Sequence, residues 1–209
     1  NSPDTAKLTA LFPNFFTDPF EGQAALAYLL LKNRVSVTAT IGPSFNVVLT
    51  NQLGNPPLAF DFSHNAHRAT QGFMWNKILS IADRLSDLLK AEPLDPANPT
   101  GPSMWSKTLI YVATDFGRTR TRIANQADFG SGHDLNNGFL MLSPLVKGNT
   151  LLGGVNRQTT YTYGFDPETG VADPMKQTSN ERDLYAGMLH ALGVDTTGSG
   201  LPDAKAFRV

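Results

Sequence analysis

Hydrophobic side chains recur at helical spacing through the segment from Thr70 to Lys90. Large apolar residues follow one another at intervals of four, three, four and three positions, at Met74, Ile78, Ile81, Leu85 and Leu88. Such spacing places these side chains on one stripe of an α-helix. The pattern therefore predicts a long amphipathic helix that buries one face, ended by the proline-rich stretch that follows it.

The segment before this helix changes from a helical to a β-type pattern. Gln23–Asn33 is rich in strong helix formers and is predicted to be a helix. Val35–Ile41 is β-branched and alternating, which predicts a strand, and further short strands are expected at Phe45–Thr50 and Pro57–Phe60. A helix joined tightly to a strand is typical of an α/β fold.

A continuous β-rich run, Thr108–Thr114, predicts a strand that is buried on both faces. Phe116–Asn137 is polar and lacks periodicity, so it is expected to form a long loop, and loops of that length are commonly functional. Two later strands and a closing helix ended by a glycine are predicted at Gly138–Ser143, Gln158–Gly164, Glu181–Leu192 and Gly193. With no boundary or repeat visible, residues 1–209 are expected to form a single α/β unit.

Composition limits the classes of function. A net charge of -1 gives no general field that would favour nucleic acid, and no apolar run is long enough for a transmembrane segment. The chain has no cysteine, which leaves His, Asp and Glu as the available metal ligands. Because it opens at Asn1 without an initiator Met or a signal peptide, we expect a processed chain or a fragment of a longer protein.

Asp61 and His64 are the first candidate ligands of a divalent metal. They lie three residues apart where the predicted strand Pro57–Phe60 ends, and a carboxylate and an imidazole at such a place can converge on one cation. The structural alternative is that Asp61 caps a turn or helix and that His64 and His67 are solvated loop residues.

Asp115 closes the run Thr108–Thr114. Ligands of open α/β sheets gather beyond the carboxyl ends of strands, where this carboxylate falls, although it could equally bond to loop amides. Arg118 is a candidate anion-binding residue, since a guanidinium matches phosphate or sulfate through paired donors. Arg118 belongs to an alternating set with Arg120 and Arg122 that could instead be solvated or paired with Asp128.

His133 and Asp134 follow two closely spaced glycines, which let the backbone approach a bound ion or substrate. His133 is the strongest lone ligand candidate of the chain. His190, by contrast, falls within the predicted last helix and is expected to be structural.

The order of these segments resembles the bacterial family known as domain of unknown function 1501. The likeness rests on Ala-Phe-Asp-Phe-Ser-His at 59–64, the long amphipathic helix, Asp-Phe-Gly-Arg-Thr at 115–119, and the glycine-flanked His-Asp at 133–134. It covers roughly residues 24 to 193. The family belongs to the alkaline-phosphatase-like superfamily, which includes metal-dependent phosphatases and sulfatases.

The resemblance implies a three-layer α/β fold, a sheet with flanking helices, that is incomplete on its N-terminal side, because the superfamily's nucleophile lies in an N-terminal segment. It also implies a site for zinc, manganese or calcium, whose ligands would be Asp61, His64, Asp115 and His133. Arg118 and Asp134 would then contact the anionic substrate. The implied partner is the missing N-terminal segment or another subunit. The implied location is exported, either periplasmic or extracellular.

The sequence leaves two other functions open. The Asp–His spacing is one residue longer than the family's, Asp115 replaces a Glu, and the order at His133 and Asp134 is reversed. These departures favour a non-catalytic structural or interaction subunit of a cell-surface or extracellular assembly. A small-molecule or carbohydrate-binding domain rests only on aromatic residues, namely Trp75, Trp105, Tyr161 and Tyr163.

Overall fold

The computed structural model describes residues 3–42, 60–114, 116–119, 122–176, 181–202, 204–206 and 208–209. These residues fall into two compact units. The first unit comprises 1–104 with 121–132, and the second comprises 105–120 with 133–209. The expectation of one α/β unit over the whole chain stays a prediction.

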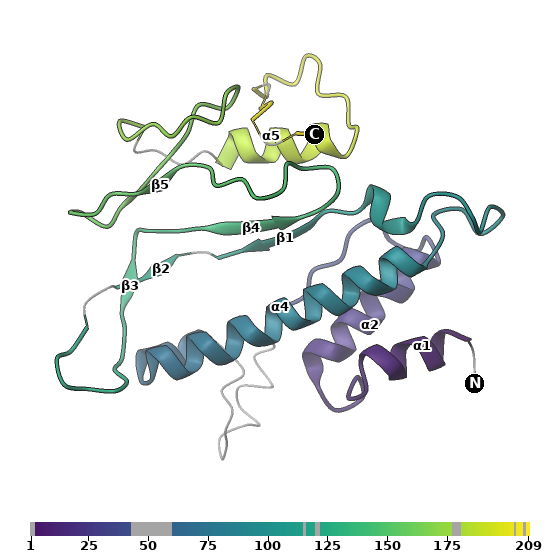
Figure 1. The fold of residues 1–209 in the computed structure, drawn as a ribbon, viewed down its shortest axis with the longest axis horizontal. Coiled ribbons are helices and arrows are strands. Elements are labelled where there is room, and N and C mark those ends of the chain that lie inside the picture. Colours follow the sequence, from purple (N-terminus) through teal and green to yellow (C-terminus); the bar gives the residue numbers. More distant parts are fainter. Residues whose placement is uncertain are drawn as a thin grey trace. The chain divides into compact units, whose positions relative to one another are not determined.

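Helices dominate the first unit. Helix α1 spans Pro3–Leu11, α2 spans Pro19–Lys32, the short 3-10 helix η1 spans Phe60–His64, and α4 spans His67–Ala91. Helix α2 packs against α4, and η1 lies at the beginning of α4 (Figure 1). The two helices predicted from the sequence at 23–33 and 70–90 are therefore confirmed as parts of α2 and α4.

The core of the first unit lies between α1, α2 and α4. Its buried apolar residues are Leu8, Phe12, Phe20, Ala24, Ala25, Ala27, Tyr28, Met74, Ile81, Ala82, Leu85, Leu88 and Leu89. Four of the five residues of the predicted stripe are in this set, and Ile78 is half-buried. The burial on α4 thus follows the spacing that the sequence shows.

The predicted strand Val35–Ile41 is wrong, since no strand forms there. Arg34 adopts a left-handed φ of 57° and ends α2, with the Val35 N–H donating to the Leu30 carbonyl at 2.9 Å. The segment beyond is exposed, Val37 at 94%. Its β-branched residues favour a strand only when a neighbouring strand pairs with them. The predicted strand Phe45–Thr50 and residues 57–59 lie outside the described residues, and Phe60 begins η1.

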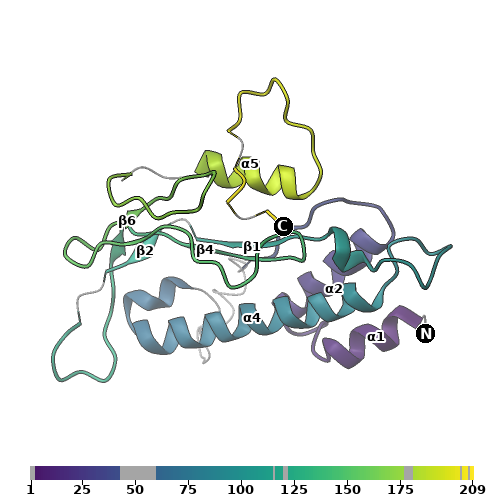
Figure 2. The same cartoon turned by 45° about the horizontal axis from the view of Figure 1, so that its top comes forward.

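The second unit contains small antiparallel sheets. Strand β1, Ile110–Ala113, pairs with β4, Phe139–Leu142, so that Ile110 lies opposite Leu142 and Ala113 opposite Phe139. Figure 2 shows the two strands side by side. Both strands were predicted, but the expected burial of the first on two faces is wrong, because exposed and half-buried residues alternate along β1. A two-stranded antiparallel pair leaves one face to solvent.

Shorter elements complete the second unit. The short 3-10 helix η2, Met104–Lys107, belongs to this unit from Trp105 onward and precedes β1. Gly117–Arg118 (β2) pairs with His133–Asp134 (β3), and Gly154–Val155 (β5) pairs with Thr162–Tyr163 (β6). Helix α5, Glu181–Ala191, confirms the predicted closing helix, and Gly193 follows it with a left-handed φ of 80°. The loop predicted at 116–137 is interrupted near its two ends, because β2 and β3 both fall within it.

A small apolar cluster holds the second unit together. Its buried members are Val146, Phe165, Leu184, Ala204 and Ala206. All strand pairs in the described part of the chain are antiparallel, and the three-layer sheet stays a prediction.

None of the described helices combines the length and the apolar character needed to cross a membrane.

Candidate functional site

Asp61 and His64 are brought together in the first unit by one turn of η1. The Nε2 atom of His64 lies 3.5 Å from Oδ1 of Asp61, and their side chains are 40% and 82% exposed, His64 being the less exposed. Two ligand atoms bound at about 2.1 Å to one tetrahedral ion lie roughly 3.4 Å apart. The observed separation therefore suits a carboxylate and an imidazole that share one divalent cation.

The short helix that carries this pair is anchored to α4 by buried polar contacts. Ser63, between the two candidate ligands, is fully buried, and its Oγ accepts a hydrogen bond from Gln71 Nε2 at 3.0 Å. Trp75 Nε1 donates to Gln71 Oε1 at 3.0 Å, and the Trp75 ring meets the Phe60 ring edge-on at 5.5 Å. Trp75 thus helps to hold η1 against α4, through Gln71 and Phe60.

Residues 127–131 form a loop, here named the 127–131 loop, that closes over the start of α4. Ala66 offers no side-chain cap to this helix, and Asp128 supplies one instead. Its carboxylate accepts from the Arg68 N–H at 2.8 Å and the Ala69 N–H at 3.1 Å. The Arg68 amide and the other backbone donors hold the pKa of Asp128 below its ordinary value.

The same loop contacts η1 directly. The Ser131 N–H donates to the Ser63 carbonyl at 2.9 Å, and Ser131 Oγ lies 2.8 Å from His67 Nδ1. Ser131 Oγ also donates to the Ser63 carbonyl at 3.2 Å. The interpretation of His67 as a solvated loop residue is wrong, since its ring is half-buried and stacks on Phe129 at 5.5 Å.

Two candidate residues of the second unit lie on β3. His133 is opposite Arg118 in the β2–β3 pair, and its ring stacks on Phe116 with centroids 3.9 Å apart. The Arg118 guanidinium lies 5.4 Å from the centre of the same Phe116 ring, a cation–π distance. Asp134 is half-buried and accepts from the Leu135 N–H at 2.8 Å.

The four predicted metal ligands are therefore placed in different ways. Asp61 and His64 lie together, His133 belongs to the other unit, and Asp115 lies outside the described residues, as does Arg120. Among the residues that the structure describes, no group of three or more His, Asp or Glu could hold an ion.

The remaining residues singled out from the sequence have local contacts. Nε2 of His190 is hydrogen-bonded to Oγ1 of Thr196, just beyond α5. Tyr161 is 51% exposed and Tyr163 half-buried in the β5–β6 region.

A buried ionic cluster around Glu92, which links the three main helices of the first unit, was missed by sequence reasoning. Glu92 is only 7% exposed and accepts from Tyr28 Oη at 2.7 Å. Lys7 of α1 and Lys32 of α2 lie 2.9 and 3.1 Å from its carboxylate oxygens. Burial alone would raise the pKa of Glu92, but these hydrogen bonds outweigh it and lower the pKa to about 2.

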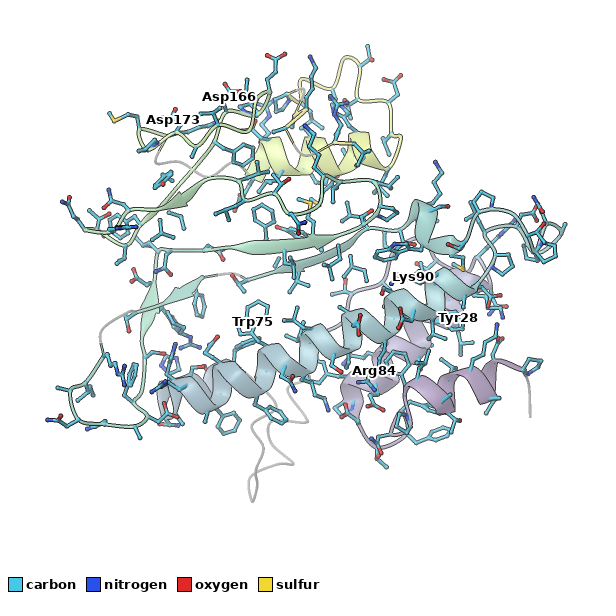
Figure 3. The ribbon with its side chains drawn as sticks, in the orientation of Figure 1. Tyr28, Trp75, Arg84, Lys90, Asp166 and Asp173 are labelled. Carbon is cyan, nitrogen blue, oxygen red and sulfur yellow. The ribbon has the colours of Figure 1, made fainter. Side chains whose placement is uncertain are left out.

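A second buried carboxylate lies between α2 and α4. Glu21 is 3.0 Å from Arg84 Nη1, which also donates to the Leu11 carbonyl. Tyr28 and Arg84 are seen where α2 and α4 meet (Figure 3). Both carboxylates have ion-pair partners, so they serve the packing of the helices. The only sequence signal for them is an acidic residue next to an apolar helical face.

Comparison of the chain with protein-family models, curated proteins and solved structures finds no match.

Proposed function

We propose that this chain is the C-terminal portion of an alkaline-phosphatase-like, metal-dependent hydrolase of phosphate or sulfate esters. The observation that carries the proposal is the 3.5 Å separation of Asp61 Oδ1 and His64 Nε2 on η1. Both side chains reach solvent, so an ion can enter without opening the core. The proposal also draws on the resemblance of 59–64 and 115–119 to the motifs of domain of unknown function 1501.

In this function Asp61 and His64 are metal ligands, and the resemblance implies the same role for Asp115 and His133. The bound cation, zinc, manganese or calcium, supplies polarisation of the phosphoryl or sulfuryl oxygens and activation of a nucleophile. Arg118 and Asp134 contact the anionic substrate. The nucleophile comes from a segment or subunit outside this chain, and the protein works in an exported location.

Elemental analysis of the purified native protein tests the metal site. We expect near-stoichiometric zinc, manganese or calcium in the wild type, and a marked loss in Asp61→Asn and His133→Ala, because each change removes a ligand. Asp87→Asn is the matched control, since Asp87 is an exposed carboxylate on α4 that forms an ion pair with Lys90, away from the candidate ligands in the sequence. Folded wild-type protein free of all these metals would overturn the proposal.

A non-catalytic interaction subunit is the second candidate, and the β1–β4 pair favours it. Each strand has one partner strand in the described part of the chain, so its other edge is left open. The pair also exposes Tyr111, Phe139 and Leu140 at 43%, 37% and 37%. An open edge with apolar side chains is a template for another chain.

This second candidate predicts self-association when the partner is absent. Sedimentation velocity of the isolated protein should show concentration-dependent oligomers, and Tyr111→Lys should shift the protein to monomer because a charge on the strand opposes pairing. Tyr161→Lys is the control, since Tyr161 is also exposed but lies outside the β1–β4 pair. Monomeric wild-type protein at all concentrations would count against this candidate.

A further inference from the structure

The backbone of His64 is fixed from two directions. Within its own segment, the Asn65 and Ala66 N–H groups both donate to the Phe62 carbonyl at 3.0 Å, which closes the turn around His64. From the other direction, the 127–131 loop lies against the carbonyl oxygen of His64 at Gly130. Two segments that are far apart in the sequence therefore fix the position of the His64 backbone.

The contact at Gly130 has no room for a side chain. A Cβ atom added to Gly130 would lie 2.1 Å from the His64 carbonyl oxygen and 3.0 Å from the carbonyl carbon. Those are backbone atoms, which cannot rotate away as a side chain can. Glycine is therefore required at 130 for the loop to close as observed.

Ser131 holds the backbone of Ser63, the residue before His64, in place. Its N–H and its Oγ both donate to the Ser63 carbonyl, and the side chain is buried, with 4% of the residue exposed. Asp128 meanwhile fixes the loop to the first turn of α4 through the Arg68 and Ala69 amides. The loop is thus attached to α4 at one end and to η1 at the other, with Gly130 between the two attachments.

We infer that the 127–131 loop positions His64 for metal binding, with Gly130 and Ser131 as positioning residues that do not contact the metal ion themselves. This inference rests on the proposed function. A cap for α4 requires only Asp128, whereas the contacts of Gly130 and Ser131 go to the carbonyls of His64 and Ser63. Those contacts hold the backbone of His64 in place before any ion binds, as a supporting set of contacts does in a preorganised metal site.

The test compares Gly130→Ala with Gly72→Ala. Gly72 lies on α4, and a Cβ atom added there would have nothing within 4 Å, so alanine meets open space and adds helix propensity. Manganese affinity is measured by calorimetry, and the imidazole resonances of His64 are followed by NMR in metal-free protein. Gly130→Ala should weaken manganese binding by roughly tenfold or more and move the His64 resonances, whereas Gly72→Ala should change neither.

A milder pair of variants keeps the inference testable if Gly130→Ala does not fold. Ser131→Ala should move the His64 resonances and weaken manganese binding, and Ser131→Thr, which keeps the hydroxyl, should restore both. Ser86→Ala is the control, because Ser86 is another buried serine, bonded to the Asp83 carbonyl on α4. Unchanged affinity and unchanged His64 resonances in the loop variants would overturn the inference.

The two proposals fail in different ways. Wild-type protein that binds no manganese, zinc or calcium overturns the proposed function. The positional role of the loop is then decided by the metal-free spectra alone: displaced His64 resonances in Gly130→Ala or Ser131→Ala support it, and unmoved resonances overturn it.

Discussion

Replacement of Glu92 by glutamine is expected to lower the free energy of unfolding by about 2–3 kcal/mol at neutral pH. The carboxylate lies among Lys7, Tyr28 and Lys32, and its pKa falls from the ordinary 4.5 to about 2 in the folded protein. Glutamine removes the charge and leaves two lysines near a neutral amide. Because those lysines come from α1 and α2, the loss weakens the junction of both helices with the end of α4.

The sign of the pH dependence follows from the lowered pKa of Glu92. A carboxylate with a lowered pKa binds fewer protons in the folded state than in the unfolded state, so its stabilisation is complete above pH 4.5. That stabilisation is lost as the pH falls from about 4.5 toward about 2. Urea denaturation across this range should show a steep decline for the wild type and a shallower one for Glu92→Gln.

Glu168→Gln provides the control for this change. Glu168 forms an ion pair with Lys205, but its side chain is 69% exposed, so water screens the pair. Little change in stability is expected there. Equal stability of Glu92→Gln and wild type at neutral pH, with parallel pH profiles, would show that the cluster does not hold the helices together.

Replacement of Leu89 by alanine is expected to cost about 2–5 kcal/mol of unfolding free energy, the range for a leucine removed from a packed core. Leu89 is 0% exposed near the end of α4. The cost comprises the lost transfer free energy of the side chain and the cavity left behind. Equilibrium urea denaturation of the whole chain, followed by the far-ultraviolet circular dichroism of its helices, measures it.

Leu79 on the same helix is the matched control for Leu89. It is the same residue type, earlier on α4, and 41% exposed. Leu79→Ala is expected to change stability by no more than about 0.5 kcal/mol. Similar losses for the two variants would contradict the burial pattern of α4, and with it the assignment of its core-facing side.

The helices were predictable from the sequence because their signals are local. The spacing of Met74, Ile81, Leu85 and Leu88 alone identifies the buried face of α4, and Gly193 marks the end of α5. Strands also depend on pairing with distant segments, so the local pattern predicts β1 and β4 correctly but fails elsewhere. Val35–Ile41 has the composition of a strand but forms none in the structure, and β1 lacks the two covered faces that its apolar run predicted.

The candidate site divides in the same way. The proximity of Asp61 and His64 could be predicted, because three residues of a turn bring them together. Their support by Gly130 and Ser131 could not, since it joins segments that are distant in the sequence. The sequence offers Asp128 as a partner for arginine side chains, yet its hydrogen bonds go to backbone amides, which no residue pattern reveals.

The central claim, that Asp61 and His64 bind a divalent cation, is tested most directly by paramagnetic broadening. Manganese added in small amounts to ¹⁵N-labelled protein broadens the amide signals near the bound ion. The account predicts selective loss of the signals of residues 60–65. Broadening centred on other acidic residues, such as Asp166 and Asp173 (Figure 3), or no selective broadening at all, would contradict it.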